Sequence, residues 1–247
     1  MFSFWKKKTP VAGKASLNWL GADMHSHLIP GIDDGAPDLE ASLTLIRGLR
    51  ELGYAKLYTT PHILWGMYDN TPDTILGGLE TVRQALKAEG LEFEFGAAAE
   101  YFVDEHFANE VQAGKPMLTL PGNHILVEAS TYAAPFDFKE VLFGLQLQNY
   151  TPIIAHPERY IYLKKDPSYL DDLRYNGCSF QLNLLALIGH YGALSKELAE
   201  HLLRNDFYDF VGTDLHHAQH LPLLEKAAAS PLLDKLRDSG KIKNAGF

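Results

Sequence analysis

Two histidines separated by one residue mark the stretch with the clearest chemical potential. His25 and His27 come directly after residues 22–24, which we expect to end a buried strand. In an extended chain, residues two apart point to the same side, so both imidazoles can converge on one divalent cation. Asp33 and Asp34 follow in a loop from which a carboxylate can reach the same place. The alternative is a chance pair of histidines on a solvent-facing strand.

Histidines and acidic residues also follow the other predicted strands. Beyond residues 22–24, short apolar runs predict strands at 57–60, 93–99, 125–128, 152–155, 179–183 and 209–212. Every one of these strands except 179–183 is followed by a potential ligand: His25, His62, Glu100, Glu128, His156 and Asp214. A single residue of this kind is more often a cap or half of an ion pair. What favours a functional site is the position that these residues share at the ends of strands, rather than any one of them.

The predicted strands alternate with predicted helices, among them 39–52, 71–89 and 138–148. Such alternation predicts an α/β fold with a mostly parallel sheet, because a helix carries the chain back between parallel strands. An open doubly wound sheet is the alternative, but its expected Gly-rich fingerprint is absent. A barrel accounts better for the potential ligands, because the carboxyl ends of barrel strands converge on one face.

Composition predicts one sizeable domain. The chain has 247 residues, 46% of them hydrophobic, and we expect an N-terminal arm at 1–20 and a single domain at 21–247. The net charge of −9 argues against a nucleic-acid partner. Cys178 is the only cysteine, which excludes an internal disulfide and fits a reducing cytoplasm. Neither a transmembrane run nor a secretory signal is recognised, so we expect membrane contact only through the arm, if at all. The oligomeric state is left open.

Nine side chains are candidate metal ligands: His25, His27, Asp34, His62, Glu100, Glu128, His156, Asp214 and His216. Imidazoles and carboxylates without sulfur suit Mn²⁺, Fe²⁺ or Zn²⁺. This number exceeds the need of one ion and predicts two or three ions that share bridging carboxylates. Such clusters hydrolyse phosphate esters by activating a water, polarising the phosphoryl group and neutralising the leaving oxygen. The other histidines lack this spacing and are interpreted as surface or loop residues: His106, His124, His190, His201, His217 and His220.

A cation and an aromatic loop accompany these ligands. Arg159 follows His156 by three residues and offers a planar fork for phosphate oxygens, the alternative being an ion pair with Glu158 or another acid. Trp65, Met67 and Tyr68 can form a wall for an aryl leaving group, or simply seal the rim of the barrel: both interpretations stay open. A cysteine-based phosphatase loop is excluded, because it needs an arginine six residues after the cysteine. Leu184 stands there instead, and Cys178 is expected to be buried.

Together these motifs resemble the polymerase-and-histidinol-phosphatase (PHP) superfamily. Within it, the chain from residue 21 onward is most similar to the bacterial metal-dependent protein-tyrosine phosphatases of capsular and exopolysaccharide loci, the CpsB/YwqE type. The motifs that carry the resemblance are residues 23–27, Asp33-Asp34-Gly35, His62, the Gly66-Met67 pair, Glu100, Glu128, His156-Pro157-Glu158-Arg159-Tyr160 and Asp214-Leu215-His216.

The resemblance implies a distorted (β/α)7 TIM-like barrel with three metal ions, Mn²⁺ above Fe²⁺, Zn²⁺ or Mg²⁺. It assigns the first ion to His25, His27, Glu100 and Asp214, the second to Glu100, Glu128 and His156, and the third to Asp34, His62 and His216. We expect Arg159, Glu100 and Asp214 to be the catalytic residues. The implied substrate is a phosphotyrosine-bearing protein, typically the tail of a tyrosine autokinase that controls polysaccharide export. A second arginine that the family often has after the last ligand is missing, and residues 217–220 read His-Ala-Gln-His.

Two other functions compete with the tyrosine phosphatase. A small-molecule phosphatase, such as one for histidinol phosphate, can use the same metal site. A non-catalytic metal scaffold is disfavoured, because structural sites are usually closed and four-coordinate, often with cysteine. A C–N hydrolase of the amidohydrolase type also begins with two histidines, but its bridging lysine is absent, and Glu100 and Glu128 stand at the middle strand ends.

Overall fold

The computed structural model describes residues 16–247 except 92, 136, 165 and 167. All paired strands run parallel, in two sheets. The smaller sheet has the order β1 (Ala22–Asp23), β2 (Lys56–Thr59), β4 (Glu94–Ala97). The larger has the order β3 (His62–Ile63), β5 (Glu100–Phe102), β6 (His124–Glu128), β7 (Thr151–Ala155), β8 (Ser179–Asn183), β9 (Phe210–Gly212).

The two sheets are continuous in space. Only two residues separate β2 from β3, and only two separate β4 from β5. Backbone hydrogen bonds bridge these gaps, from Ala98 N to Thr59 O at 2.9 Å and from Glu100 N to Pro61 O at 3.0 Å. Each pair is therefore one interrupted strand, and the chain has the seven strand positions that the sequence predicts. A parallel bridge between Ser26 and Leu215 joins the end of the first position to the end of the last.

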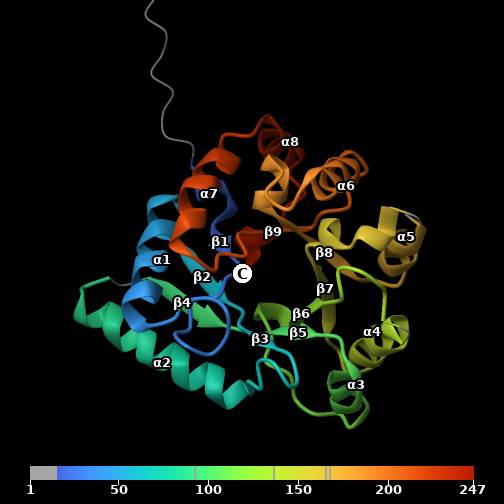
Figure 1. Cartoon of the computed structure of the whole chain (residues 1–247), viewed down its shortest axis with the longest axis horizontal. Helices are drawn as coiled ribbons and strands as arrows, with labels where there is room; N and C mark the ends of the chain where they lie inside the picture. The colour runs from blue at the N-terminus through green and yellow to red at the C-terminus, as the bar shows by residue number, and fades with distance from the viewer. Residues whose placement is uncertain (1–15, 92, 136, 165, 167) are drawn as a thin grey trace, which may run out of the picture.

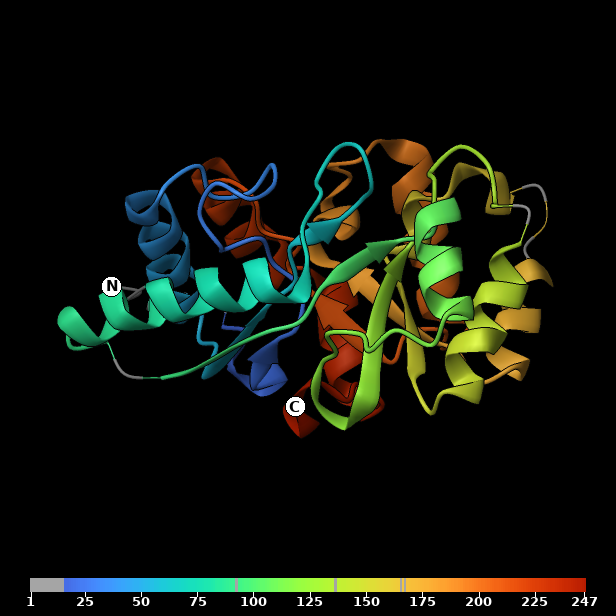
Figure 2. The ribbon, with the colours of Figure 1, turned by 90° about the horizontal axis from the view of Figure 1, so that it is seen from below.

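Helices surround the strands, as Figure 1 shows. They are α1 (Leu39–Glu51), α2 (Pro72–Ala88), α3 (Glu105–Gln112), α4 (Phe138–Leu147), α5 (Ser168–Tyr175), α6 (Ala193–Arg204), α7 (Leu221–Ala228) and α8 (Pro231–Ser239). The first two begin where the sequence predicts, because Asp38 accepts a hydrogen bond from Ala41 N and Thr71 forms a reciprocal cap with Thr74. In Figure 2, α2 lies along the outside of the smaller sheet, and Arg83 on α2 donates to the carbonyl of Phe95 on β4.

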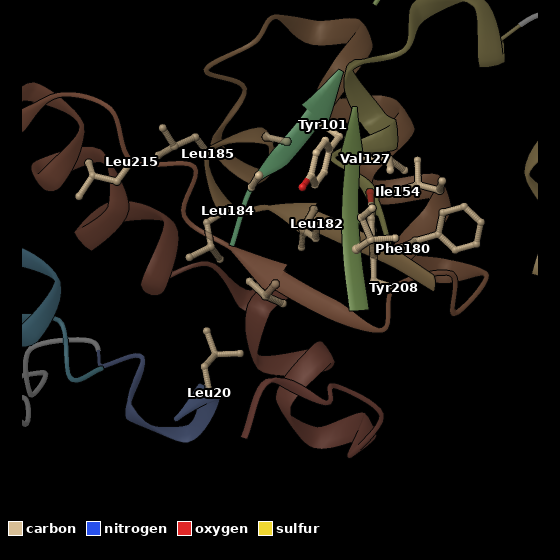
Figure 3. Close-up of a cluster of buried hydrophobic side chains, with 14 of the residues drawn as sticks. Leu20, Tyr101, Val127, Ile154, Phe180, Leu182, Leu184, Leu185, Tyr208 and Leu215 are labelled. Atoms are coloured by element: carbon tan, nitrogen blue, oxygen red, sulfur yellow. The ribbon is translucent and has the colours of Figure 1, made fainter. Parts of the chain in front are cut away.

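Two buried apolar clusters hold these layers together. Val127 and Ile154 belong to the larger cluster, which Figure 3 shows around β5 to β8. Their neighbours Leu126 and Ile153 belong to the smaller one. Successive residues of a strand point to opposite faces, so β6 and β7 are buried on both faces. Such burial explains why these strands read as unbroken apolar runs, and it leaves their carboxyl ends as the place where polar side chains gather.

The first described residues belong to this packed structure. Leu17 and Leu20 are buried in the larger cluster, and Leu17 N donates to the carbonyl of Leu52 at 2.8 Å. Residues 1–15 of the predicted arm lie outside the described residues, and the boundary at residue 21 stays a prediction. Among the helices of the described part, none has both the length and the apolar character that crossing a membrane requires.

Candidate metal centre

All nine predicted ligands meet at one place. Four groups of side chains place their ligand atoms within 4.8 Å of one another: His27, Asp34, His62 and His216; His25, His27 and Glu100; His25, His156 and Asp214; His62, Glu100 and Glu128. Every candidate belongs to at least one group. The interleaving of these groups is what shared carboxylates require, because one side chain then serves neighbouring ions.

Glu100 lies at the centre of this arrangement. Its Oε2 is 3.1 Å from Nδ1 of His62, 3.3 Å from Nε2 of His25 and 3.5 Å from Nε2 of His27. The oxygen is buried and has no hydrogen-bond partner of good geometry among the described residues. Three histidine nitrogen atoms thus surround a carboxylate oxygen that lacks a hydrogen-bond partner. A cation bound between them would satisfy this oxygen.

The histidines present the correct ring nitrogen to the centre. Nδ1 of His25 lies 2.9 Å from Oε1 of Gln181, and Nδ1 of His27 lies 2.8 Å from Oδ2 of Asp33. Since the amide oxygen of Gln181 and the ionised carboxylate of Asp33 can only accept hydrogen bonds, each Nδ1 carries a proton, and Nε2 is the nitrogen whose lone pair a cation would take in place of a second proton. The two Nε2 atoms lie 3.4 Å apart. Orienting partners of this kind are typical of metal-binding histidines, so the residues fit a divalent cation.

The other two predicted sets also gather. Nε2 of His156 lies 3.2 Å from Oε1 of Glu100 and 3.7 Å from Oε1 of Glu128. Oδ1 of Asp34 lies 3.5 Å from Nε2 of His62 and 3.4 Å from Nε2 of His216. The structure thus brings together each of the three ligand sets that the resemblance implies, and the assignment of ions to them stays a prediction.

Charge accumulates in the centre. Burial opposes a proton on His25, but the carboxylates of Glu100 and Asp214 outweigh this effect and raise the pKa of His25 to about 9. Burial, together with the negative charge of Glu100, raises the pKa of Glu128 to about 7. Carboxylates this close hold protons or attract cations, because their mutual repulsion is otherwise uncompensated.

Two of the predicted ligands adopt a strained backbone. His156 follows β7 with φ of 31°, and Asp214 follows β9 with φ of 50°. Both values lie in the left-handed region, which residues other than glycine rarely adopt. Close packing beside Asp214 helps to hold it in this conformation. A Cβ added at Gly212, two residues before it, would lie only 2.7 Å from Cβ of His25. The fold therefore stores strain where β7 and β9 deliver their ligands, as functional sites often do.

The sequence-based prediction missed the role of β8, the one strand without a ligand at its end. Gln181 orients His25, and Asn183 Nδ2 donates to Oδ2 of Asp214 at 2.8 Å. Both side chains are fully buried. The available signal was two polar residues, two positions apart, in a strand buried on both faces. The placement of Glu100 and His62 also needs correction, because they begin β5 and β3 after an interruption instead of following a finished strand.

Arg159 lies at the centre, and of the ion pairs considered for it, the one with an acid other than Glu158 is observed, since its partner is Asp214. Its Nη1 is 3.1 Å from Oδ2 of Asp214, and its guanidinium stacks over Tyr191 at 4.7 Å. Glu158 instead accepts hydrogen bonds from Asn183 N and the hydroxyl of Tyr208. Burial raises the pKa of Glu158 to about 7. The ion pair with Glu158 is therefore wrong, and the arginine pairs with a predicted ligand.

A cleft of about 430 Å³ opens onto the centre. Its lining includes the predicted residues Asp34, His62, Glu128, Arg159, Asp214 and His216, together with Leu64, Met67, Tyr68, Phe102, Tyr191, His217 and His220. Tyr68 stacks on His62 with ring centroids 5.4 Å apart and lines the cleft, a position that fits both interpretations of the loop. Trp65 does not line the cleft. It stacks instead on His106, with centroids 4.2 Å apart.

Two of the remaining histidines are more enclosed than the surface or loop positions predicted for them. His124 begins β6, and its ring packs edge-on against Phe210 and Phe247. His220 is partly buried beside the cleft, and its Nδ1 has no hydrogen-bond partner among the described residues.

Comparison with known proteins agrees with this geometry. The model of the family described as "Capsular polysaccharide synthesis, CpsB/CapC" matches residues 21–238. The chain belongs to the CpsB/CapC family. A relative named tyrosine-protein phosphatase YwqE, from Bacillus subtilis, is 28% identical over 229 residues, which cover 89% of this chain and 90% of the relative.

Solved structures extend the comparison to the fold. The crystal structures of YwqE from Bacillus subtilis and CpsB from Streptococcus pneumoniae, described as unique metal-dependent tyrosine phosphatases, include a chain with a TM-score of 0.78 and 26% identity. The match covers 91% of this chain and 90% of that one. Histidinol phosphate phosphatase from Lactococcus lactis, with a TM-score of 0.51 and 14% identity over 92% of this chain and 93% of that one, shares the fold alone. The α/β fold predicted from the sequence is confirmed.

Proposed function

We propose that this member of the CpsB/CapC family hydrolyses phosphotyrosine in proteins with the help of divalent metal ions. The observation that carries the proposal is the gathering of nine imidazoles and carboxylates around Glu100, with Arg159 beside them in an open cleft. YwqE and CpsB, to which the chain is similar, are named as metal-dependent tyrosine phosphatases, which supports the same chemistry.

The three predicted ligand sets would hold the ions, with Glu100 shared between the first and second. Mn²⁺ is the proposed ion, as the resemblance implies, and the nitrogen and oxygen ligands without sulfur suit it as they suit Fe²⁺ or Zn²⁺. Such ions, when bound, supply an activated water and neutralise the oxygens of the transferring phosphoryl group. Asp33, Gln181 and Asn183 would contribute by fixing the orientation of His27, His25 and Asp214.

Arg159 would bind the phosphoryl group. Only its Nη1 makes a hydrogen bond to the described residues, so Nε and Nη2 are left to meet an incoming anion. Its side chain is 27% exposed and lines the cleft, where a planar fork can make two charge-assisted hydrogen bonds to phosphate oxygens. Tyr68, stacked on His62, would flank the aryl ring of the substrate.

The proposed partner is the phosphorylated tail of a tyrosine autokinase in the cytoplasm, acting in capsular or exopolysaccharide synthesis. The description of the matching family supports this setting. A protein tail needs an open approach to the metals, which a cleft lined in part by exposed side chains such as Met67 and His217 provides.

A substrate panel tests the proposal. With Mn²⁺ present, we expect kcat/KM for phosphotyrosyl peptides to exceed that for histidinol phosphate by at least about tenfold, since the ring that bears the phosphate can pack against Tyr68, whereas the phosphate of histidinol phosphate is on an alkyl chain. The reverse preference would replace the proposal by the small-molecule alternative. Absence of turnover on both substrates, with metal shown to be bound, would favour the non-catalytic scaffold.

A further inference from the structure

A second cavity lies next to the cleft, on the other side of the loop after β3. It measures about 490 Å³ and is lined mainly by apolar surface, with Ile63, Trp65, Tyr101, Pro116 and Met117 among its residues. Tyr68 lines both this groove and the cleft, so the two hollows are contiguous. Figures 1 and 2 both show the loop standing between α2 and α3.

The loop that separates the two hollows is a tight hairpin. Leu64 N donates to Tyr68 O at 3.1 Å, Tyr68 N donates to Leu64 O at 2.8 Å, and Gly66 N donates to Asp69 Oδ1 at 2.6 Å. Gly66 at its tip has φ of 79°, which other residues rarely adopt. These bonds make the hairpin a firm ridge rather than a loose connection.

The ridge exposes one large apolar side chain toward each of the two hollows. Met67 is 68% exposed and lines the cleft, whereas Trp65 is 62% exposed and lines the groove. Trp65 is held there by its stack on His106 of α3, which in turn lies 3.4 Å from Glu110. Large exposed aromatic side chains beside a binding cleft are typical of contacts with a partner chain.

We propose that the groove binds the polypeptide segment next to the phosphotyrosine of the substrate. The inference rests on the proposed function. If the phosphotyrosyl side chain enters the cleft beside Tyr68, the main chain on one side of it passes over the hairpin, and the next apolar side chain reaches Trp65. The groove is mostly apolar, and both acidic residues of its lining are already engaged, Glu110 with Lys115 at 2.9 Å and Asp69 with Gly66 N at 2.6 Å, so the occupant is an apolar rather than a charged stretch.

Paired substrates separate this role from a role in the reaction. Trp65→Ala is assayed on 4-nitrophenyl phosphate, on free phosphotyrosine and on phosphotyrosyl peptides in which leucine or serine occupies each flanking position in turn. We expect kcat/KM for the best leucine peptide to fall about tenfold, the scale of one lost aromatic contact, while the two small substrates stay within about twofold of the original protein. In the same variant, the preference for leucine over serine should disappear.

Two further variants sharpen the result. His106→Ala removes the stacking partner of Trp65 and should weaken peptide turnover in the same direction by a smaller factor. Tyr175→Ala removes an aromatic ring that is 92% exposed and lines neither hollow, and it should change nothing. Melting temperatures of all three should stay close to that of the original protein, because the altered side chains are largely exposed or on the rim.

Each contrary outcome has a distinct meaning. An equal loss on small substrates would place Trp65 in the reaction site and overturn the inference, as would unchanged peptide turnover. A change in molar mass in solution without a peptide-specific loss would show that a second copy of the chain covers the groove, which also overturns it. Failure of the original protein to hydrolyse any phosphotyrosyl substrate would instead overturn the proposed function itself.

Discussion

Nη1 of Arg159 lies 3.1 Å from Oδ2 of Asp214, on the carboxylate that also faces His25 and His27. This contact joins the segment after β7 to the segment after β9 across the candidate metal centre. Asn183 donates to the same oxygen at 2.8 Å. The guanidinium is thereby fixed beside the predicted ligands through Nη1, while Nε and Nη2 make no hydrogen bond to the described residues.

The first prediction concerns Arg159. Arg159→Ala should lower kcat/KM for an aryl phosphate by roughly 10²–10³, the scale of losing one transition-state hydrogen-bond donor. Arg159→Lys should restore only part of it, because lysine supplies charge without the fork. Metal content should stay near normal. A variant with ordinary kinetics and a lowered melting temperature would show that the contact with Asp214 is only structural.

The second prediction concerns Gln181, which orients His25. Gln181→Met keeps the volume but removes the acceptor for His25 Nδ1, so we expect metal affinity to fall by about 10- to 100-fold. Calorimetric titration with Mn²⁺ measures this directly, apart from activity. Gln112→Met, on the exposed end of α3, is the matched control. Equal affinities for the two variants would remove Gln181 from the support of the centre.

The third prediction concerns Glu100. Because its carboxylate is shared between groups of ligands, Glu100→Ala should abolish activity and reduce the number of ions bound per chain. Glu94→Ala, at an exposed position of β4, should leave both unchanged. Metal counting on the purified variants decides, and full metal content with intact turnover would refute a bridging role.

The fourth prediction concerns Cys178. Burial raises its pKa to about 12, so the thiol is neutral at physiological pH and is a poor nucleophile. Cys178→Ser should keep most of the activity and lower the melting temperature by a few degrees, because a buried hydroxyl needs a partner. A folded serine variant without activity would reopen a cysteine-based mechanism.

Much of the fold could be predicted from local signals. Asp38 and Thr71 begin α1 and α2 by capping, and apolar runs such as residues 152–155 mark strands that are buried on both faces. The interruptions between β2 and β3 and between β4 and β5 were missed. They depend on hydrogen bonds between strands far apart in sequence, such as Glu100 N to Pro61 O, which no local pattern encodes.

Likewise, one part of the candidate site could be predicted from the sequence and another part could not. Four of its predicted ligands, His25, Glu128, His156 and Asp214, lie at or just after the carboxyl end of a strand, so their gathering follows from the parallel topology, whereas His62 and Glu100 begin β3 and β5. The roles of Gln181 and Asn183 could not be predicted, because a buried amide is informative only once its partner is known. The placement of Trp65 away from the cleft depends likewise on its stack with His106, which lies far along the chain on α3.

The most direct test of the account measures bound metal and phosphotyrosine hydrolysis on one sample. Chelation should remove the ions and abolish hydrolysis of a phosphotyrosyl peptide, and added Mn²⁺ should restore it in proportion to the ions bound, up to about three per chain. Full activity in protein shown to be free of metal would contradict the account, and so would a fully loaded protein that leaves phosphotyrosine intact.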